Sequence, residues 1–195
     1  MRTVFILSGE MMNKELKKRI QEDVYRNANG RSFISRLLAP NPNLKFLKAF
    51  RCAQHYRKKS ILYYFYRFKL SYFMRRYFIQ IPIETKIGRG LYIGHFGRII
   101  VNRRAVIGNN VNIATGITIG QTNREKRQGC PTIGNKVWIG TNAVIVGGIK
   151  IGDDVMIAPN SFVNFDVPNG SIVIGNPGQI ISRENATEGY INNMV

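Results

Sequence analysis

A six-residue repeat over residues 133–163 constrains the fold of this chain more than any other feature. Every sixth position holds a branched aliphatic residue: Ile133, Ile139, Ile145, Ile151, Ile157 and Val163. The position after each is usually small, and the turn positions that follow are rich in Gly, Asn and Asp. A period of six fits neither an α-helix nor an alternating β-strand. It marks an internal repeat, which predicts a stacked architecture in which each unit contacts its neighbours.

The repeat predicts a mainly β protein, a parallel β-helix. Each hexad would supply one short strand and one turn, and the aliphatic residues of stacked coils would form an inward ladder. Gly, Asn and Asp suit the turns because they adopt positive φ at the lowest cost. A strict period of six indicates a triangular prism with three hexads per coil. An ordinary β-sandwich with regular strands is the alternative.

The repeat is expected to begin near Ile81, and it is interrupted twice. Two residues are inserted within the segment 95–100, after which the phase resumes at Val101. A longer interruption over residues 121–132 is polar and basic, and it predicts an exposed loop. Departures from a strict repeat are where a solenoid usually carries its function.

The first 80 residues carry helical patterns in place of hexads. Residues 13–27 show a charged amphipathic pattern, and a short helix is expected at residues 32–38. Asn43 is a suitable N-cap for a third helix. We therefore expect a basic α-helical N-terminal region (1–80), a β-helix domain (81–181) and a polar, loosely held C-terminal tail (182–195).

The segment from Ile61 to Phe78 is dense in Tyr and Phe, and it also contains four Lys and Arg residues. Cations so near the middle of a segment argue against a membrane-spanning helix. Two interpretations stay open. The segment is either a helix packed under the β-helix with its cations reaching solvent, or an interfacial helix that rests on an anionic membrane.

The net charge of +18 is unevenly distributed, because residues 1–80 hold 18 Lys/Arg and 4 Asp/Glu whereas residues 81–195 hold 11 and 7. The basic half could meet nucleic acid, anionic lipid or a phosphorylated ligand, or it could be a solvated cationic face. Two distant cysteines, Cys52 and Cys130, indicate neither a disulfide framework nor a zinc site. With no signal peptide or transmembrane stretch evident, we expect a cytoplasmic protein.

The chain has two histidines, His55 in the helical part and His95 at the first break of the repeat. A bulge there would lift the His95 ring off the prism face, so we expect His95 to be functional. An imidazole titrates near about 6.5. It can take a proton from an alcohol that attacks a thioester carbonyl and pass it to the leaving thiolate. A backbone N–H or a polar side chain of a neighbouring coil would meet the oxyanion.

Several short motifs follow one another along the repeat: Ile87-Gly88-Arg89-Gly90, Ile93-Gly94-His95-Phe96-Gly97, Ile119-Gly120-Gln121-Thr122, Cys130-Pro131-Thr132-Ile133-Gly134, Asp166-Val167-Pro168 and Gly175-Asn176-Pro177-Gly178. Together they resemble the serine-acetyltransferase-like branch of the hexapeptide acyltransferases. The resemblance covers residues 63–181, and it implies a left-handed β-helix.

The resemblance also implies a reaction and an assembly. Acetyl-CoA would be the donor, His95 the catalytic base, and no metal would be needed. The protein would be a homotrimer with its sites between neighbouring prisms. The pantetheine arm would lie along the turns Gly140-Thr141 and Ala158-Pro159, and the candidates for binding the CoA phosphates are Lys136 and Arg183.

Some positions depart from the pattern of serine acetyltransferases. Gly94 stands where they have an Asp before the catalytic His, and Gly129-Cys130 stands where they have an Arg-His pair. Gln80 aligns with a further Asp that orients the base in those enzymes. The Gln80 amide oxygen can still accept a hydrogen bond from the imidazole N–H, but it stabilises imidazolium less than a carboxylate would. The Asp-Pro-Ala of their helical domain has no counterpart near residues 39–41.

These departures resemble the short acetyltransferases of capsule or exopolysaccharide synthesis instead. The expected acceptor is therefore a sugar hydroxyl, often on a lipid-linked precursor, and a peripheral contact with the inner face of an anionic membrane would suit it. The expected substrate-binding residues are Gly94, Arg127 and Cys130.

Other functions stay open. Within enzymes, the alternatives are serine O-acetylation and transfer from acyl carrier protein. A zinc carbonic anhydrase on the same prism would need three His ligands per site, and this repeat supplies one. A nucleic-acid-binding module would suit the charge, but no binding motif is present and no nucleic acid is expected. A purely structural solenoid is the last alternative.

Overall fold

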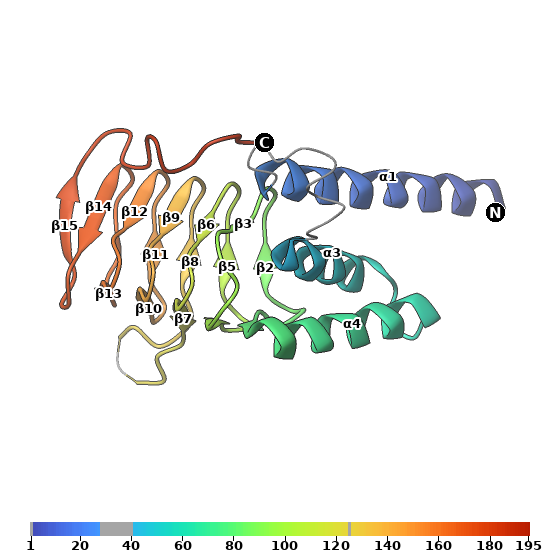
Figure 1. Cartoon of the computed structure of the whole chain (residues 1–195), viewed down its shortest axis with the longest axis horizontal. Coiled ribbons are helices and arrows are strands. Elements are labelled where there is room, and N and C mark those ends of the chain that lie inside the picture. Colours follow the sequence, from blue (N-terminus) through green and yellow to red (C-terminus); the bar gives the residue numbers. More distant parts are fainter. Residues whose placement is uncertain (1, 28–40, 125) are drawn as a thin grey trace.

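The computed structural model describes residues 2–27, 41–124 and 126–195, with the side chains of the first helix described from Lys14 onward. Three described helices lead into a long prism of short strands (Figure 1). The helices are α1 (Arg2–Asn27), α3 (Pro42–His55) and α4 (Ile61–Tyr77). They lie together beyond one end of the prism, with α3 between α1 and α4.

The prism consists of three sheets, here called A, B and C, and consecutive strands up to β12 pass from one sheet to the next. Sheet A contains β1 (Ile79–Gln80), β4 (Ile99–Val101), β7 (Thr118–Gly120), β10 (Val144–Val146) and β13 (Phe162–Val163). Sheet B contains β2 (Lys86–Ile87), β5 (Val106–Ile107), β8 (Thr132–Ile133) and β11 (Lys150–Ile151). Sheet C contains β3 (Tyr92–Ile93), β6 (Asn112–Ile113), β9 (Val137–Ile139), β12 (Val155–Ile157), β14 (Ser171–Ile174) and β15 (Gln179–Ser182).

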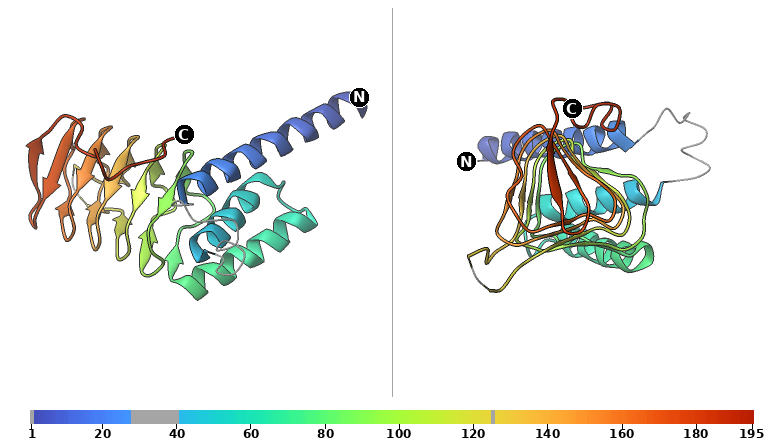
Figure 2. Two further views of the ribbon diagram at one scale, coloured as in Figure 1. Left: turned by 45° about the horizontal axis from the view of Figure 1, so that its top comes forward. Right: turned by 90° about the vertical axis from the view of Figure 1, so that its left-hand side faces the viewer.

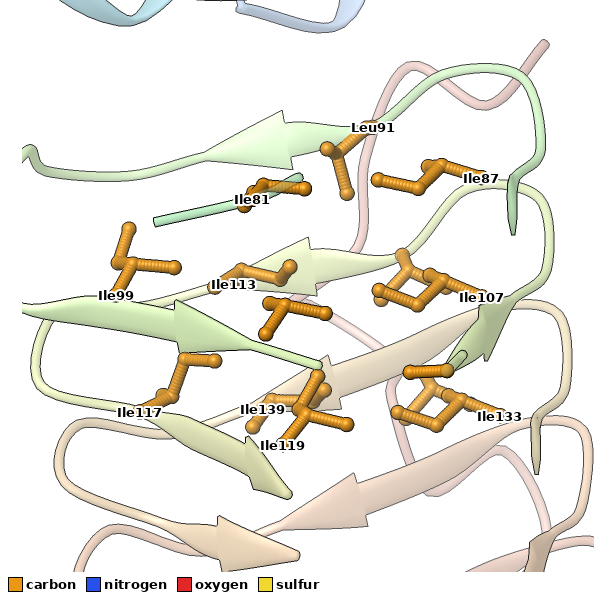
Figure 3. Packing of buried hydrophobic residues seen from close by; sticks show 14 of the residues in the cluster. Ile81, Ile87, Leu91, Ile99, Ile107, Ile113, Ile117, Ile119, Ile133 and Ile139 are labelled. Carbon is orange, nitrogen blue, oxygen red and sulfur yellow. The ribbon is translucent and has the colours of Figure 1, made fainter. Parts of the chain in front are cut away.

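All strand pairs are parallel except β14 with β15, so the predicted parallel β-helix is confirmed. Viewed along its axis, the coils of the prism lie over one another with a roughly triangular outline (Figure 2), and the buried residues form one core cluster. The strand register places identical side chains above one another in sheet B: Ile87, Ile107, Ile133 and Ile151. Figure 3 shows part of this ladder, with Ile87, Ile107 and Ile133 stacked inside the prism beside isoleucines of sheets A and C. Each buried aliphatic side chain contributes about 1.5–3 kcal/mol.

Side chains from the helices complete the hydrogen bonding of the first coil. The Asn27 amide donates to the carbonyl of Leu91 (2.8 Å) and accepts from the N–H of Ile93 (3.2 Å), as a neighbouring strand would. The Asn43 amide donates to the carbonyl of Ile93 (2.8 Å). Asn43 is therefore not the predicted cap of α3; that residue is Asn41, whose side chain accepts from the N–H of Asn43. The helices thus cover a sheet edge that would otherwise leave backbone groups unpaired.

A buried ion pair ties two helices to this coil. Arg51 Nε lies 2.8 Å from Asp23 Oδ2, and both side chains are 2% exposed. The Arg51 guanidinium also donates to the carbonyls of Ile87 (2.9 Å) and Gly88 (2.6 Å), while Asp23 Oδ1 accepts from the N–H of Leu91 (3.1 Å). Both charges are therefore hydrogen-bonded as well as paired, which buried charges require.

Helix α4 presents two different faces. One packs against the core through buried Leu70 and through Tyr66, Phe73, Met74 and Tyr77. The other is exposed and apolar, formed by Ile61, Leu62, Tyr64, Phe65, Phe68 and Tyr72. Packing under the β-helix is thus confirmed for the first face, and interfacial contact stays a prediction for the second. Within the described ranges, no helix is both long and apolar enough to cross a membrane.

The other helical predictions had different outcomes. The helix expected over residues 13–27 is present and begins earlier, at Arg2. The short helix expected at residues 32–38 lies outside the described residues. The first strand of sheet A, β1, begins at Ile79, two residues before the expected start of the repeat.

The prediction of a loosely held C-terminal tail is wrong. Residues 183–195 run back along the prism to the end of α1 (Figure 1), and Ala186, Thr187 and Ile191 are buried. The Thr187 hydroxyl donates to Asp154 (2.6 Å), and the Val195 N–H donates to the Asn110 side chain (3.0 Å). A polar composition did not reveal this because the tail is fixed mainly by hydrogen bonds.

Candidate active site

The prism has three edges, which we name after the sheets that they join. At the C–A edge the chain leaves sheet C and enters sheet A, and its segments are 94–98, 114–117, 140–143 and 158–161. At the A–B edge the segments are 81–85, 102–105, 121–131 and 147–149. At the B–C edge they are 88–91, 108–111, 134–136, 152–154 and 168–170.

His95 lies at the C–A edge of the first coil, and its side chain is exposed. The backbone on both sides of it is fixed, because the N–H of Gly94 donates to Ile113 (3.1 Å) and the N–H of Gly97 donates to Tyr77 (3.0 Å). Gly97 has φ 139°, and a Cβ there would lie 2.4 Å from the Thr115 hydroxyl. In the described part of the chain the imidazole makes no hydrogen bond, so both of its nitrogens are available to a substrate.

The two turns expected to bind the donor lie on this same edge. Gly140-Thr141 follows β9 and Ala158-Pro159 follows β12, and the two stack through a hydrogen bond from Asn160 N–H to the carbonyl of Thr141 (2.9 Å). Gly140 permits the close approach, because a Cβ there would lie 2.6 Å from the nitrogen of Pro159. Coils are about 4.8 Å apart. The Gly140 turn is therefore roughly 10 Å from the coil of His95, two coils along the edge.

The two cations expected to meet the CoA phosphates lie elsewhere. Lys136 is at the B–C edge, where its Nζ lies 3.1 Å from Asp154 Oδ1. Arg183 follows β15, and its N–H donates to Gly170 at the same edge. Sheet C separates this edge from the Gly140 turn, so the structure does not bring either cation together with the expected donor turns. The hexad pattern did not indicate this because it does not specify which edge each turn occupies.

Gln80 lies on β1 in sheet A, beside Ile100 on β4. It lines a groove of about 540 Å³ between α4 and sheet A, together with Arg75 and Arg98. Its amide makes no hydrogen bond to any described residue, so the predicted contact with His95 is not formed in this structure. Neither arginine was a sequence-based candidate, because the hexad pattern gives no signal for outward-facing positions.

The interrupting loop at the A–B edge projects from the prism (Figure 2). Its two arms pair through Thr122 and Gly129. Cys130 is half-buried and its thiol donates to the Asn102 side chain (3.3 Å), while Arg127 donates to the carbonyl of Asn164 (2.6 Å). Within one chain, sheet A thus separates Cys130 and Arg127 from His95 and Gly94. Both cysteines are free thiols, and among the described residues no group of three His, Cys, Asp or Glu side chains could hold a metal ion.

A β-helix of hexads with one histidine at an edge, in line with glycine-containing turns, defines the class of hexapeptide-repeat transferases. The family model for the bacterial transferase hexapeptide (six repeats) matches residues 130–164. A serine acetyltransferase of Helicobacter pylori is 35% identical over 145 residues, which is 73% of this chain and 83% of the relative. One of Staphylococcus aureus is 38% identical over 116 residues, or 58% of this chain and 54% of the relative.

Solved structures agree with these sequence comparisons. Serine acetyltransferase from Brucella abortus superposes with a TM-score of 0.75 at 27% identity, covering 91% of this chain and 74% of that one. Soybean serine acetyltransferase complexed with serine superposes with a TM-score of 0.72 at 29% identity, covering 85% and 69%. The chain belongs to the family of hexapeptide-repeat transferases, and it is an acetyltransferase of that class. None of these relatives bears a capsule or exopolysaccharide name, so the expected closeness to that group is not supported.

Proposed function

We propose that the protein transfers an acetyl group from acetyl-CoA to a hydroxyl group, with His95 as the general base. The observation that supports this most is the position of His95 on the C–A edge, in line with the Gly140-Thr141 and Ala158-Pro159 turns. A pantetheine arm laid along these turns would point its thioester towards the coil of His95. The separation of roughly 10 Å between the two coils suits an extended arm.

The reaction needs no protein nucleophile. His95 accepts the proton of the acceptor hydroxyl while the hydroxyl oxygen attacks the thioester carbonyl carbon. The tetrahedral intermediate then collapses, the carbon–sulfur bond breaks, and the imidazolium returns the proton to the CoA thiolate. A backbone N–H or polar side chain near the C–A edge would stabilise the oxyanion.

A homotrimer would complete this site. Sheet A separates His95 from the loop at the A–B edge in one chain, so the loop can meet His95 only in a neighbouring copy. The outward face of sheet A carries half-buried apolar side chains at Val144 and Phe162, which suit burial between protomers. In such an assembly, Arg127 and Cys130 of one protomer would lie beside His95 of the next.

Serine is the acceptor that the comparisons favour, because the relatives found carry the name serine acetyltransferase. A sugar hydroxyl is the second candidate, and the surroundings of His95 favour it. Gly94 provides no carboxylate beside the base, and among the described residues that line the adjacent groove there is no Asp or Glu. A site for serine would be expected to neutralise its ammonium group.

The decisive experiment measures thiol release from acetyl-CoA with serine and, separately, with a panel of hexoses and hexose phosphates. His95→Ala should reduce turnover with the true acceptor by about 10²–10⁴-fold, the usual contribution of a general base. His55→Ala is the matched control because His55 lies in α3, away from the C–A edge, and it should retain activity. Full activity of His95→Ala would exclude the proposed mechanism.

A further inference from the structure

The groove between α4 and sheet A has an unusual lining. Its lining combines apolar side chains, Met74, Phe78 and Ile100, with the polar side chains of Arg75, Arg98 and Gln80. Its volume of about 540 Å³ falls within the usual range for small-molecule sites, which is about 300–1,000 Å³. An apolar cleft with a few convergent polar groups is the usual form of a ligand site.

The two arginines of the groove have no partner within the chain as described. Neither Arg75 nor Arg98 forms an ion pair or hydrogen bond with a described residue. Arg103, by contrast, is an exposed arginine that has a partner, because it forms an ion pair with Glu84 at 2.9 Å. Each guanidinium presents a fork of N–H donors that suits phosphate or carboxylate oxygens, and no described residue occupies either fork.

The groove is fixed next to His95. The N–H of Gly97 donates to Tyr77 (3.0 Å) and the N–H of Ile99 donates to Phe78 (3.0 Å), so the segment that carries His95 is held against the end of α4. Arg98 lies within this held segment, three residues after His95. Three residues of chain span at most roughly 11 Å. A ligand of monosaccharide size could therefore reach from His95 into the groove.

We propose that this groove binds the anionic oxygens, phosphate or carboxylate, of a hydroxyl-bearing acceptor of monosaccharide size, an inference that rests on the proposed role of His95. The acceptor hydroxyl lies at His95 while its anionic group contacts Arg98 and Arg75. Free serine fits this arrangement less well, because its hydroxyl and carboxylate are close together and its ammonium finds no carboxylate among the described residues that line the groove.

A binding experiment without acetyl-CoA tests the site separately from the reaction. Glucose 6-phosphate, glucuronate and glucose are titrated by calorimetry into the wild-type protein, Arg98→Gln and Arg57→Gln. We expect an anionic sugar to bind more tightly than glucose, and Arg98→Gln to weaken that binding by about 10- to 100-fold, the value of a charge-assisted hydrogen bond. Arg57→Gln removes the same charge just before α4, at the opposite end of that helix from the groove, and should have no effect. The two anionic sugars distinguish phosphate from carboxylate.

Equal binding of glucose and both anionic sugars, or equal losses in the two arginine variants, would overturn the proposal. Kinetics then separate the two roles. Arg98→Gln should raise KM for the anionic acceptor with little change in kcat, whereas His95→Ala should lower kcat and still bind the sugar. Anion binding without any acetyl transfer would support the groove and overturn the role of His95. If Arg98→Gln left acetyl transfer unchanged, the role of His95 would be supported and the proposed anion site in the groove would be overturned.

Discussion

At the scale of single residues, Gly94 sets the chemistry beside the proposed base. A Cβ at this position would lie 3.5 Å from a ring carbon of Tyr92 and 3.9 Å from the carbonyl of Ile113, which are ordinary contacts. The backbone therefore accepts a side chain here. The glycine itself provides no carboxylate beside His95, and this affects which acceptor can bind.

Gly94→Asp should increase the use of serine. A carboxylate next to His95 would pair with the ammonium of serine, and a charge-assisted hydrogen bond of this kind is worth about 1.5–3 kcal/mol. We expect kcat/KM for serine to rise by about 10- to 100-fold, measured by thiol release. Gly94→Asn has a similar shape without the charge and should not produce the gain. An equal rise in both variants would contradict an ionic effect.

The ionisation of the Asp154 carboxyl makes the stability of the tail depend on pH. Its burial acts to raise the pKa of the carboxyl, but the hydrogen bond from Thr187 and the contact with Lys136 outweigh burial and lower the pKa. Because the pKa is lower in the folded than in the unfolded chain, the stabilisation is fully present above the ordinary value of about 3.9. It is lost as the pH falls through the folded-state pKa.

Asp154→Asn should therefore reduce the free energy of unfolding by about 1–2 kcal/mol at pH 7. The difference between the wild type and the variant should narrow as the pH falls below about 4. Denaturant unfolding at several pH values measures this difference in unfolding free energy. Asp153→Asn provides a control for removing a neighbouring carboxylate, since Asp153 accepts from Asn135 at the prism surface rather than from the tail. A difference that stays constant down to pH 2 would contradict this explanation.

At the scale of elements, the N-terminal helices act as a cap on the prism. Asn27, Asn43 and Arg51 supply hydrogen bonds that a further coil would otherwise make. Repeat proteins generally need such capping units, because an end coil exposes unpaired backbone groups and apolar surface. At the other end, β15 closes sheet C by pairing antiparallel with β14.

Arg51→Ala should destabilise the cap strongly. The substitution leaves Asp23 buried without its partner, and breaking a buried ion pair in this way costs about 3–5 kcal/mol. Arg103→Ala removes an ion pair with Glu84 in which both side chains are exposed, and it should cost at most about 1 kcal/mol. Chemical denaturation followed by circular dichroism compares the two. A similar loss of unfolding free energy in both variants would show that the ion pair of Arg51 does not hold the helices to the prism.

The exposed face of α4 gives a second prediction at this scale. Residues 41–80 contain ten Lys and Arg residues and no Asp or Glu, so this face would be attracted to anionic lipid. Lys69→Gln combined with Arg76→Gln should reduce co-sedimentation with phosphatidylglycerol vesicles by roughly 30-fold. Lys17→Gln combined with Lys18→Gln, on α1, is the matched control. Equal vesicle binding by the wild type and both variants would rule out a membrane contact through α4.

The sequence predicted the repeat and the position of His95 because both depend on local periodicity. Hexads such as Ile133 to Ile139 fix the strand and the inward side chain without reference to the rest of the chain. It did not predict the Asp23–Arg51 pair or the groove at Arg98, because these contacts join segments far apart in sequence. It also misassigned the cap of α3, since Asn41 and Asn43 are equally suitable by residue type.

At the scale of the whole molecule, the tail over residues 183–195 connects parts of the prism that do not otherwise touch. It contacts the fourth coil at Asp154, the third through the ring of Tyr190 on Trp138, and the second at Asn110. The Arg26 side chain then joins it to α1 by donating to the carbonyl of Asn192. The tail therefore spans most of the length of the prism.

Removal of residues 184–195 should lower the melting temperature of the protein and make its thermal unfolding less cooperative. The truncation loses the buried side chains of Ala186 and Ile191 and the hydrogen bonds of the tail to Asp154 and Asn110. We expect a broader thermal transition, because a solenoid without long-range contacts unfolds by fraying from its ends. A truncated chain that melts as sharply and at the same temperature as the full chain would show that the tail adds nothing to stability.

In a simple solenoid each coil responds only to its neighbours, so a disturbance fades with distance. The tail of this chain creates a second route between the two ends. Opening of the last coil and detachment of α1 are then thermodynamically linked, and the link must act equally in both directions. A ligand that orders the helical cap would therefore slow hydrogen exchange in β14, although no bonded neighbour of β14 has changed.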